Sequence, residues 1–258
     1  MFTFIVFCAG ASASGKTTFS RMLEGALKRE GVSTKLISMD NYYKERNGLL
    51  REENNFDVPD AFDLPLLRKH VQDINAKIPI DLPQFCFKIK DRLKETIPFD
   101  PRGTNVVIIE GIQALHDINS YKIPEQHKYC IFVEVDSYLD YLKRRIIRDI
   151  PPSSEGGRST TEEITRQREL KSGVRDAFFQ YIAPSKRNAH YKISNNNRHD
   201  LNEALQGVVD EIISKLKIPV SKPEYSVAKL ISMYILSEPI KNKAGEQPVD
   251  DIVYNLGS

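Results

Sequence analysis

The segment from Gly10 to Thr17 has the spacing G-x-x-x-x-G-K-T, which is typical of a phosphate-binding loop. Backbone N–H groups in such a loop, and at the start of the helix after it, can donate to phosphate oxygens. Lys16 can then reach the β- and γ-phosphates, and the Thr17 hydroxyl can coordinate Mg²⁺. A flexible glycine turn without a ligand is the alternative. The residues predicted to contact the nucleotide are Gly10, Ala11, Ser12, Ala13, Ser14, Gly15, Lys16, Thr17 and Thr18.

Two acidic residues stand where apolar runs end. Asp40 directly follows Thr34–Met39, and Glu110 directly follows Val106–Ile109. Because ligands of open α/β sheets bind at the carboxyl ends of the strands, both carboxylates are expected near the phosphates. Asp40 suits the removal of a proton from an acceptor hydroxyl, and Glu110 suits the Mg²⁺ shell. The alternatives are that Asp40 caps the next turn and that Glu110 is a solvated strand end.

A turn-rich segment, Asn55–Asp63, carries three carboxylates interleaved with aromatic residues. Carboxylates can accept hydrogen bonds from vicinal hydroxyls, and phenylalanine offers an apolar wall, so this segment can grip a polyol. A turn that caps the following helix, which contains Leu66, Leu67 and Val71, explains the same residues equally well. Both interpretations stay open on these residues alone.

A basic group extends from a predicted helix into the loop after it, and it can neutralise charge on a transferring phosphoryl group. Arg144 and Arg148 are four positions apart, and Arg145 and Arg148 are three apart, so only part of the group can point into one site. A solvated basic face is the alternative. The group consists of Lys143, Arg144, Arg145, Arg148 and Arg158.

The elements that must position these residues follow the βαβ rhythm of a parallel sheet covered by helices. We therefore predict an α/β fold of the P-loop NTPase type, with a parallel β-sheet flanked by helices. The predicted strands lie in the runs Phe2–Ala9, Thr34–Met39, Val106–Ile109 and Ile131–Val135. The helical spacings are those of Phe19, Met22, Leu23, Ala26 and Leu27, of Leu139, Leu142, Ile146 and Ile147 after Ser137, and of Leu201, Leu205, Val208, Ile212 and Leu216.

The later part of the chain contains a predicted lid and a tail. Pro151–Ser159 has the prolines, glycines and serines of a mobile loop, and a polar helix is expected to begin near Thr161. We place the lid at about residues 150–160, within a main domain of residues 1–217. Residues 218–258 form a predicted C-terminal extension without an assigned role.

Composition limits the class of protein. With 37 basic and 35 acidic residues the net charge is +2, so no global field marks nucleic acid or a membrane as the partner. The odd, widely spaced Cys8, Cys86 and Cys130 indicate reduced thiols rather than disulfides or a zinc site. We expect a soluble, cytoplasmic protein because the sequence has no secretion signal and no apolar stretch of membrane-spanning length.

The chain resembles the uridine kinase (uridine–cytidine kinase) family, within the larger group that includes phosphoribulokinase and pantothenate kinase. The resemblance extends from Phe4 to about Ile213. Several motifs in the same order carry it, which makes it far more specific than the phosphate-binding loop alone. These motifs are Gly10–Thr18, Asp40–Tyr43, Asn55–Asp63, Glu110–Leu115 and Arg144–Ile150.

The resemblance implies an ATP- and Mg²⁺-dependent kinase that phosphorylates a small-molecule hydroxyl, above all the 5′-hydroxyl of a ribonucleoside, and that can form a homo-oligomer. Asp40 is the implied catalytic base. The further residues implied are Lys16 and Arg148 for catalysis, Thr17 and Glu110 for Mg²⁺, Asp57 for the ribose hydroxyls, and Arg145, Arg148 and Arg158 for substrate or phosphates.

A hairpin expected at about residues 78–99 departs from the family. Uridine kinases usually carry Pro-x-Tyr-Asp-Phe-x-x-His-x-Arg there, and the Tyr and His contact the pyrimidine. In Pro83–Arg92 of this chain, Phe85 replaces the Tyr and Lys90 replaces the His. A lysine only donates, whereas a neutral imidazole can donate and accept, so the base edge would be read differently. Phe85 can still stack on a planar base, and Lys90 and Arg92 can attract a sugar phosphate.

Three functions therefore compete. The leading one is ATP-dependent phosphorylation of a ribonucleoside. The second is the same phosphoryl transfer to a non-pyrimidine acceptor, such as another nucleoside or a sugar phosphate. The third is a nucleotide-binding regulatory or scaffold protein, which the altered hairpin and the tail support. The joint presence of Lys16, Thr17, Asp40 and Glu110 opposes the third function because a scaffold has no chemical need for that set.

Overall fold

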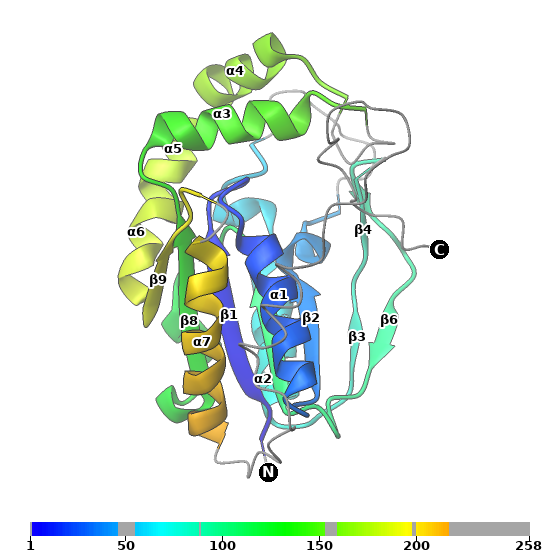
Figure 1. Cartoon of the computed structure of the whole chain (residues 1–258). Coiled ribbons are helices and arrows are strands. Elements are labelled where there is room, and N and C mark those ends of the chain that lie inside the picture. Colours follow the sequence, from blue (N-terminus) through cyan, green and yellow to red (C-terminus); the bar gives the residue numbers. More distant parts are fainter. Residues whose placement is uncertain (1, 46–54, 88, 153–158, 198–199, 217–258) are drawn as a thin grey trace, which may run out of the picture.

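The computed structural model describes residues 2–45, 55–87, 89–152, 159–197 and 200–216 (Figure 1). At its centre is a parallel sheet with the strand order β2-β7-β1-β8-β9. β1 and β7 are buried at every position, as expected of central strands covered on both faces. The prediction of a parallel sheet flanked by helices is therefore confirmed. The strands are β1 (Phe4–Gly10), β2 (Thr34–Ser38), β7 (Val106–Glu110), β8 (Lys128–Glu134) and β9 (Tyr191–Ser194).

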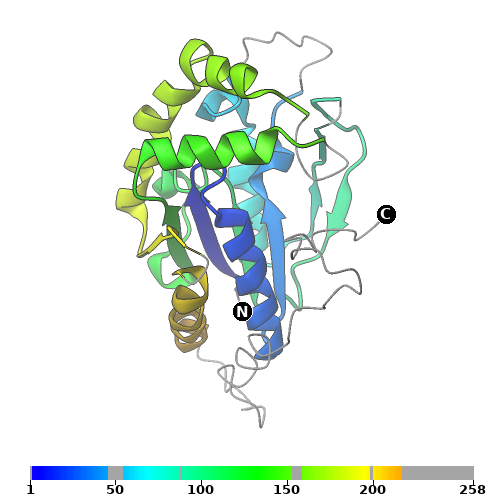
Figure 2. The ribbon, with the colours of Figure 1, turned by 45° about the horizontal axis from the view of Figure 1, so that its top comes forward.

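Helices cover both faces of this sheet (Figures 1 and 2). On one face, α1 (Lys16–Arg29) and α7 (Asp200–Leu216) pack against β1, as in the contact cluster of Phe19, Leu205 and Val6. On the other face, α2 (Leu64–Asn75) belongs to a second cluster that includes Leu67 and Phe7. Alternate residues of β1 thus supply two separate cores, and the strand is held between them.

Side-chain caps fix where several helices begin. The side chains of Asp63, Ser137 and Thr161 each accept a hydrogen bond from the backbone N–H three positions ahead. These caps begin α2, α3 (Tyr138–Asp149) and α4 (Glu162–Lys171), because each satisfies an N–H that has no partner within its helix. The helix starts predicted at Ser137 and near Thr161 are confirmed.

The inward face of α3 differs from the one predicted. Leu139 and Ile147 are 66% and 71% exposed, although their spacing suggested an apolar inner face. Ile146 is buried as predicted, and Tyr141, Arg145 and Asp149 are buried beside it. The apolar spacing was right for Ile146 and wrong for Leu139 and Ile147, because the inner face of α3 also carries an ionic cluster, described below, that buries charged side chains.

Beside the β2 end of the sheet lie two small antiparallel pairs of strands (Figure 1). They fall within the segment predicted as a hairpin insert. β3 (Ile80–Leu82) pairs with β6 (Ile97–Phe99), and β4 (Phe85–Cys86) pairs with β5 (Asp91–Arg92). The remaining short helices are Met39–Tyr42, Pro59–Ala61, Ile118–Tyr121, Glu125–His127, α5 (Val174–Ala177), the π-helix Phe178–Ile182, α6 (Ala183–Ser185) and Lys186–Asn188.

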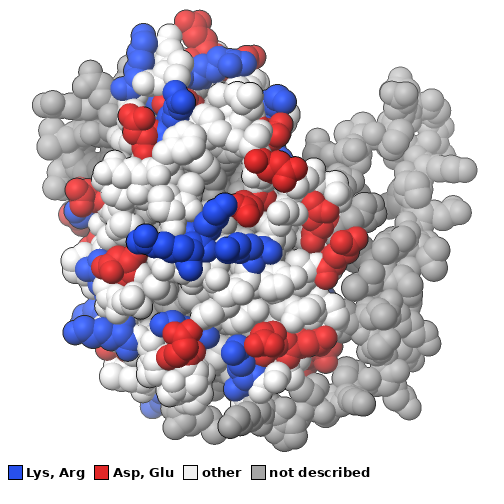
Figure 3. Space-filling model, turned by 90° about the vertical axis from the view of Figure 1, so that its left-hand side faces the viewer, with Lys and Arg blue, Asp and Glu red and all other residues white. Residues whose placement is uncertain are grey.

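The described surface carries both signs of charge. Figure 3 shows acidic and basic side chains interspersed over one face, with a short row of basic side chains across its middle. In the part of the chain that the structure describes, none of the helices has the length and apolar composition needed to cross a bilayer. Cys8 and Cys130 are buried, Cys86 is half-buried, and all three are free thiols.

Candidate active site

The phosphate-binding loop connects β1 to α1 at the carboxyl edge of the sheet. At both of its glycines, neighbouring atoms lie too close to leave room for a side chain. Gly10 has φ 152°, and a Cβ there would lie 2.3 Å from the Val133 carbonyl oxygen. Gly15 has φ 98°, and its Cβ would lie 2.3 Å from Asn195 Nδ2. Any other residue at either position would clash and would be strained. Ala13 also has a positive φ of 67°, which completes the tight curve of the loop.

The polar groups of the loop fit an anionic ligand. Gly15 precedes α1 and offers no side-chain cap, so the N–H groups at the start of this helix have no side-chain acceptor there. Ser14 Oγ is buried and has no hydrogen-bond partner among the described residues. Of the other predicted contacts, Ala11 and Ser12 are buried, whereas Thr18 is exposed. A loop with these unsatisfied donors fits a phosphate group.

The Glu110 carboxylate lies close to the side chains of Thr17, Lys16 and Ser38. Its Oε2 accepts a hydrogen bond from Thr17 Oγ1 at 3.0 Å and lies 4.0 Å from Lys16 Nζ. Its Oε1 accepts from Ser38 Oγ at 2.8 Å. Glu110 is only 4% exposed, so its charge is balanced inside the protein rather than by water. A hydroxyl and a carboxylate in contact, next to a phosphate loop, are the oxygen ligands that suit Mg²⁺.

Asp40 lies in a short helix, Met39–Tyr42, immediately after β2. Its backbone N–H donates to Ser38 Oγ at 3.3 Å, so Ser38 caps this turn. The same Ser38 hydroxyl reaches Glu110, which joins the segment of the predicted base to the predicted metal ligand. Asp40 itself is half-buried at the carboxyl edge of the sheet.

Arg148 reaches the phosphate-binding loop from α3. Its Nη1 donates to Ser12 Oγ at 2.7 Å, and its Nε donates to Asp149 Oδ1 at 2.7 Å. Arg144, on the outer side of the same helix, donates to the Asn196 carbonyl oxygen instead. Only part of the basic group therefore reaches the loop, as predicted, although Arg144 and Arg148, which are four positions apart, have different partners. Arg158 lies outside the described residues.

Arg145 is enclosed by three carboxylates. Its Nη1 lies 2.9 Å from Asp57 Oδ2 and 3.2 Å from Glu169 Oε1, and its Nε lies 3.8 Å from Asp149 Oδ2. Burial opposes the charge of Arg145, but the Asp57 carboxylate and its neighbours hold the pKa of Arg145 well above its usual range. Burial also raises the pKa of Glu169, against the effect of the Arg145 charge. The cluster is thus a buried ionic network rather than a solvated basic face.

Asp57 is held from three sides. Arg145 binds its carboxylate, the Gln113 amide donates to its carbonyl oxygen at 2.6 Å, and its own N–H donates to Asn55 Oδ1 at 2.9 Å. The sequence left open whether this segment caps a helix or binds a substrate. The residue that caps the helix is Asp63, not Asp57. Asp57 is 5% exposed, so these contacts orient its carboxylate with little competition from water.

Aromatic side chains cluster beside this carboxyl edge. The Tyr43 ring stacks on Phe62 with centroids 4.2 Å apart and lies 5.0 Å from Phe85, whose ring in turn lies 5.3 Å from that of Phe87. Phe85 is buried, whereas Phe87 is 55% exposed. The Phe85 backbone N–H donates to Asn41 Oδ1, which ties β4 to the residue after Asp40.

The two predicted cations of the hairpin have different environments. Arg92 donates to the carbonyl oxygens of Tyr42 and Tyr43 at 3.0 and 2.9 Å and to Asp63 Oδ2 at 3.1 Å. It therefore anchors the hairpin to the segment after Asp40. Lys90 is exposed in the turn between β4 and β5, with a positive φ of 53°.

Two of the three cysteines, Cys8 and Cys130, are poorly suited to nucleophilic chemistry. Burial raises the pKa of Cys8 to about 12 and the pKa of Cys130 to about 12. Because the thiolate is the nucleophile, these groups stay protonated and inert near neutral pH.

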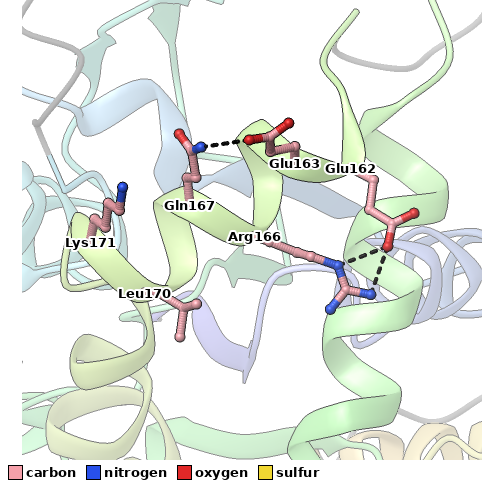
Figure 4. Close-up of a pocket in the computed structure, with 6 residues that line it drawn as sticks. All are labelled: Glu162, Glu163, Arg166, Gln167, Leu170 and Lys171. Carbon is pink, nitrogen blue, oxygen red and sulfur yellow. Dashed lines mark hydrogen bonds and ion pairs between the residues drawn. The ribbon is translucent and has the colours of Figure 1, made fainter.

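A surface hollow of about 390 Å³ lies on the outer side of α4 (Figure 4). Its polar residues pair along the helix, with Arg166 bound to Glu162 and Gln167 bound to Glu163. None of its lining residues belongs to the motifs of the sheet edge. The hollow is consequently not the candidate active site. Its lining consists of Glu162, Glu163, Arg166, Gln167, Leu170 and Lys171.

Sequence reasoning missed Ser38, Gln113, Glu169 and Asn195. Serine at a strand end is common, so Ser38 gave no distinct signal. Gln113 and Glu169 gain their roles from contacts with Asp57 and Arg145, which are distant in the chain. Asn195 contacts the phosphate-binding loop across 181 positions. Only the fold brings these groups together.

Comparison with known proteins agrees with this geometry. The model of the phosphoribulokinase / uridine kinase family matches residues 5–202. Uridine kinases from Yersinia enterocolitica and Yersinia pestis are each 38% identical over 192 residues, which cover 72% of this chain and 84% of each relative. Phosphoribulokinase from Rhodobacter spheroides has a similar fold, with a TM-score of 0.54 and 12% identity over 84% of this chain and 99% of its own. The chain therefore belongs to the phosphoribulokinase / uridine kinase family.

Proposed function

We propose that this protein is a small-molecule kinase that transfers the γ-phosphoryl group of ATP to the 5′-hydroxyl of a ribonucleoside, with uridine and cytidine as the first acceptors to test. The observation that carries the proposal is the hydrogen-bonded set Thr17, Glu110, Ser38 and Asp40, which joins the phosphate-binding loop to the predicted base. The 38% identity to uridine kinases supports the nucleoside as acceptor.

In the proposed reaction, Mg²⁺–ATP supplies the phosphoryl group and part of the charge neutralisation when it is bound. The loop N–H groups and Lys16 hold the phosphates, and Thr17 and Glu110 supply oxygens to the metal. Asp40 orients the acceptor hydroxyl and takes its proton. Arg148, which contacts the loop at Ser12, stabilises negative charge on the transferring group.

Asp57 and Arg145 are the proposed site for the ribose hydroxyls. Their mutual contact at 2.9 Å fixes a carboxylate acceptor and a guanidinium donor side by side. Vicinal hydroxyls can both donate and accept, so they complement such a pair. Phe85, with Tyr43 behind it, offers an aromatic surface for the base.

A non-pyrimidine acceptor is the second candidate, and the hairpin favours it. Lys90 is exposed in the hairpin turn, where it can meet an anionic group such as a sugar phosphate. Phe85 lacks the hydroxyl that the family uses toward the pyrimidine. The two candidates differ in the acceptor alone and share the donor and the base.

Acceptor-dependent ADP formation with Mg²⁺–ATP tests this proposal. The panel comprises ribonucleosides, deoxyribonucleosides and phosphorylated sugars, with ATP alone as the blank. Turnover with uridine or cytidine supports the first candidate, and turnover confined to another acceptor supports the second. ADP binding without turnover on any acceptor would favour the regulatory alternative.

A further inference from the structure

Asn195 reaches the phosphate-binding loop from the far end of the chain. It follows β9 directly, and its Nδ2 donates to the Ser14 carbonyl oxygen at 2.7 Å. Its own backbone N–H donates to the Glu134 carbonyl oxygen at 2.7 Å, which fixes it to the end of β8. Asn195 is 8% exposed, so the contact is shielded from water. Two neighbouring strands thus present one amide donor to the loop.

The contact determines the orientation of one peptide plane. The Ser14 carbonyl and the Gly15 N–H belong to the same planar trans peptide, so they point in opposite directions. Asn195 binds the carbonyl on one side, and the Gly15 N–H is therefore directed away from Asn195. A phosphate-binding loop works by turning its N–H groups toward the ligand and its carbonyls outward.

Gly15 is matched to the same contact. A Cβ at Gly15 would lie 2.3 Å from Asn195 Nδ2. A side chain at Gly15 would therefore displace the Asn195 amide, and the φ of 98° favours glycine independently. Without Asn195, the Ser14 carbonyl would be a buried acceptor without this donor, free to rotate together with the Gly15 N–H.

We propose that Asn195 is a positioning residue for the nucleotide phosphates: it fixes the Ser14–Gly15 peptide so that the Gly15 N–H donates to a phosphate oxygen. The inference rests on the proposed function in one respect, which is that the loop binds the phosphates of a nucleotide. It adds a residue outside all the motifs to the phosphate site.

Direct binding by the full chain tests the inference. Calorimetry measures the affinity for ADP and for inorganic tripolyphosphate, with Mg²⁺ present, in the wild type, Asn195→Ala and Asn195→Asp. Asn196→Ala is the matched control, because the Asn196 amide pairs with Asp136 rather than with the loop. A thermal melt of each variant and the KM for the nucleoside acceptor report on general damage.

We expect both Asn195 variants to bind ADP and tripolyphosphate at least about tenfold more weakly, the size of effect that one charge-assisted hydrogen bond has. The acceptor KM and the Asn196→Ala affinities should stay at the wild-type values. If Asn195→Ala binds tripolyphosphate with wild-type affinity, the inference is overturned and the proposed function is not. An acceptor KM that rises by the same factor as the phosphate affinity falls would also overturn the inference. A wild-type chain that binds neither ADP nor tripolyphosphate would contradict the proposed function as well.

Discussion

Ser38 Oγ donates a hydrogen bond to Glu110 Oε1 at 2.8 Å, and the two residues are direct partners across the β2–β7 ladder. Register alone therefore brings them together. The same hydroxyl accepts from the Asp40 N–H, so one serine holds a predicted metal ligand and positions the turn of the predicted base. In the proposed mechanism, the chemistry of the site depends on this pairing of neighbouring strand ends.

Replacement of Ser38 by alanine should disturb both the Glu110 carboxylate and the turn that carries Asp40. Glu110 loses a donor and the turn of Asp40 loses its cap, so we expect kcat to fall about tenfold, equivalent to about 1.4 kcal/mol. The Mg²⁺ concentration for half-maximal activity should rise. Steady-state kinetics over a Mg²⁺ titration measure both. Ser120→Ala, which removes a surface hydroxyl bound to the Asp117 carbonyl, is the control, and identical kinetics in the two variants would refute the link.

Arg148 and Arg144 offer a matched comparison on one helix. Arg148 contacts Ser12 of the phosphate-binding loop, whereas Arg144 contacts the Asn196 carbonyl at the surface. We expect Arg148→Met to lower kcat/KM for ATP by about 100-fold, because a cation that stabilises transferring charge is lost. Arg144→Met should stay within about twofold, as exposed polar contacts contribute little. Equal effects of the two variants would contradict the placement of Arg148.

Arg92 should affect the binding of the acceptor and not the binding of the nucleotide. Its guanidinium joins β5 to the carbonyls of Tyr42 and Tyr43 and to Asp63, so Arg92→Met releases the hairpin from the Asp40 segment. We expect the acceptor KM to rise roughly tenfold, since several hydrogen bonds are lost. ADP affinity by calorimetry should not change. Arg102→Met, which breaks only an exposed pair with Asp100, is the control; a loss of ADP affinity in Arg92→Met would speak against a role limited to the hairpin.

The free energy of unfolding should depend on pH through the titration of His70. Burial lowers the pKa of His70 below 6.5, and its Nδ1 lies 3.0 Å from the Tyr42 hydroxyl. The unfolded chain then binds more protons than the native one below pH 6.5, so the stabilisation is complete above that pH and is lost as the pH falls. We expect the difference in unfolding free energy between wild type and His70→Gln to shrink between about pH 7.5 and pH 5. Urea unfolding at the two pH values measures it, and a constant difference would disprove the assignment.

Local patterns predicted much of the site. The phosphate-binding loop, the strand ends at Asp40 and Glu110 and the cap at Ser137 depend on residues close in sequence, and spacing alone reveals them. The contacts of Ser38 and Asn195 depend on which strands become neighbours. A single sequence does not report that pairing, so these residues emerged only from the fold.

The inner face of α3 illustrates a second limit. Periodicity found the helix but only part of its inner face: Ile146 is buried as predicted, whereas Leu139 and Ile147 are exposed and Arg145 and Asp149 are buried in an ionic cluster with Glu169. Burial of a charge becomes favourable only when its partners are in place. Of the partners of Arg145, Glu169 comes from α4 and Asp57 from an earlier segment, and the α3 sequence reveals neither.

Acceptor-dependent ADP formation by the wild type and by Asp40→Asn, measured together with ADP affinity, tests the central claim most directly. We predict that uridine or cytidine stimulates ADP formation, and that Asp40→Asn lowers kcat by at least about 100-fold, the contribution of a positioned general base. ADP affinity should be equal in the two proteins. Undiminished turnover in Asp40→Asn, or a wild type that binds ADP and transfers phosphate to no acceptor, would contradict the account.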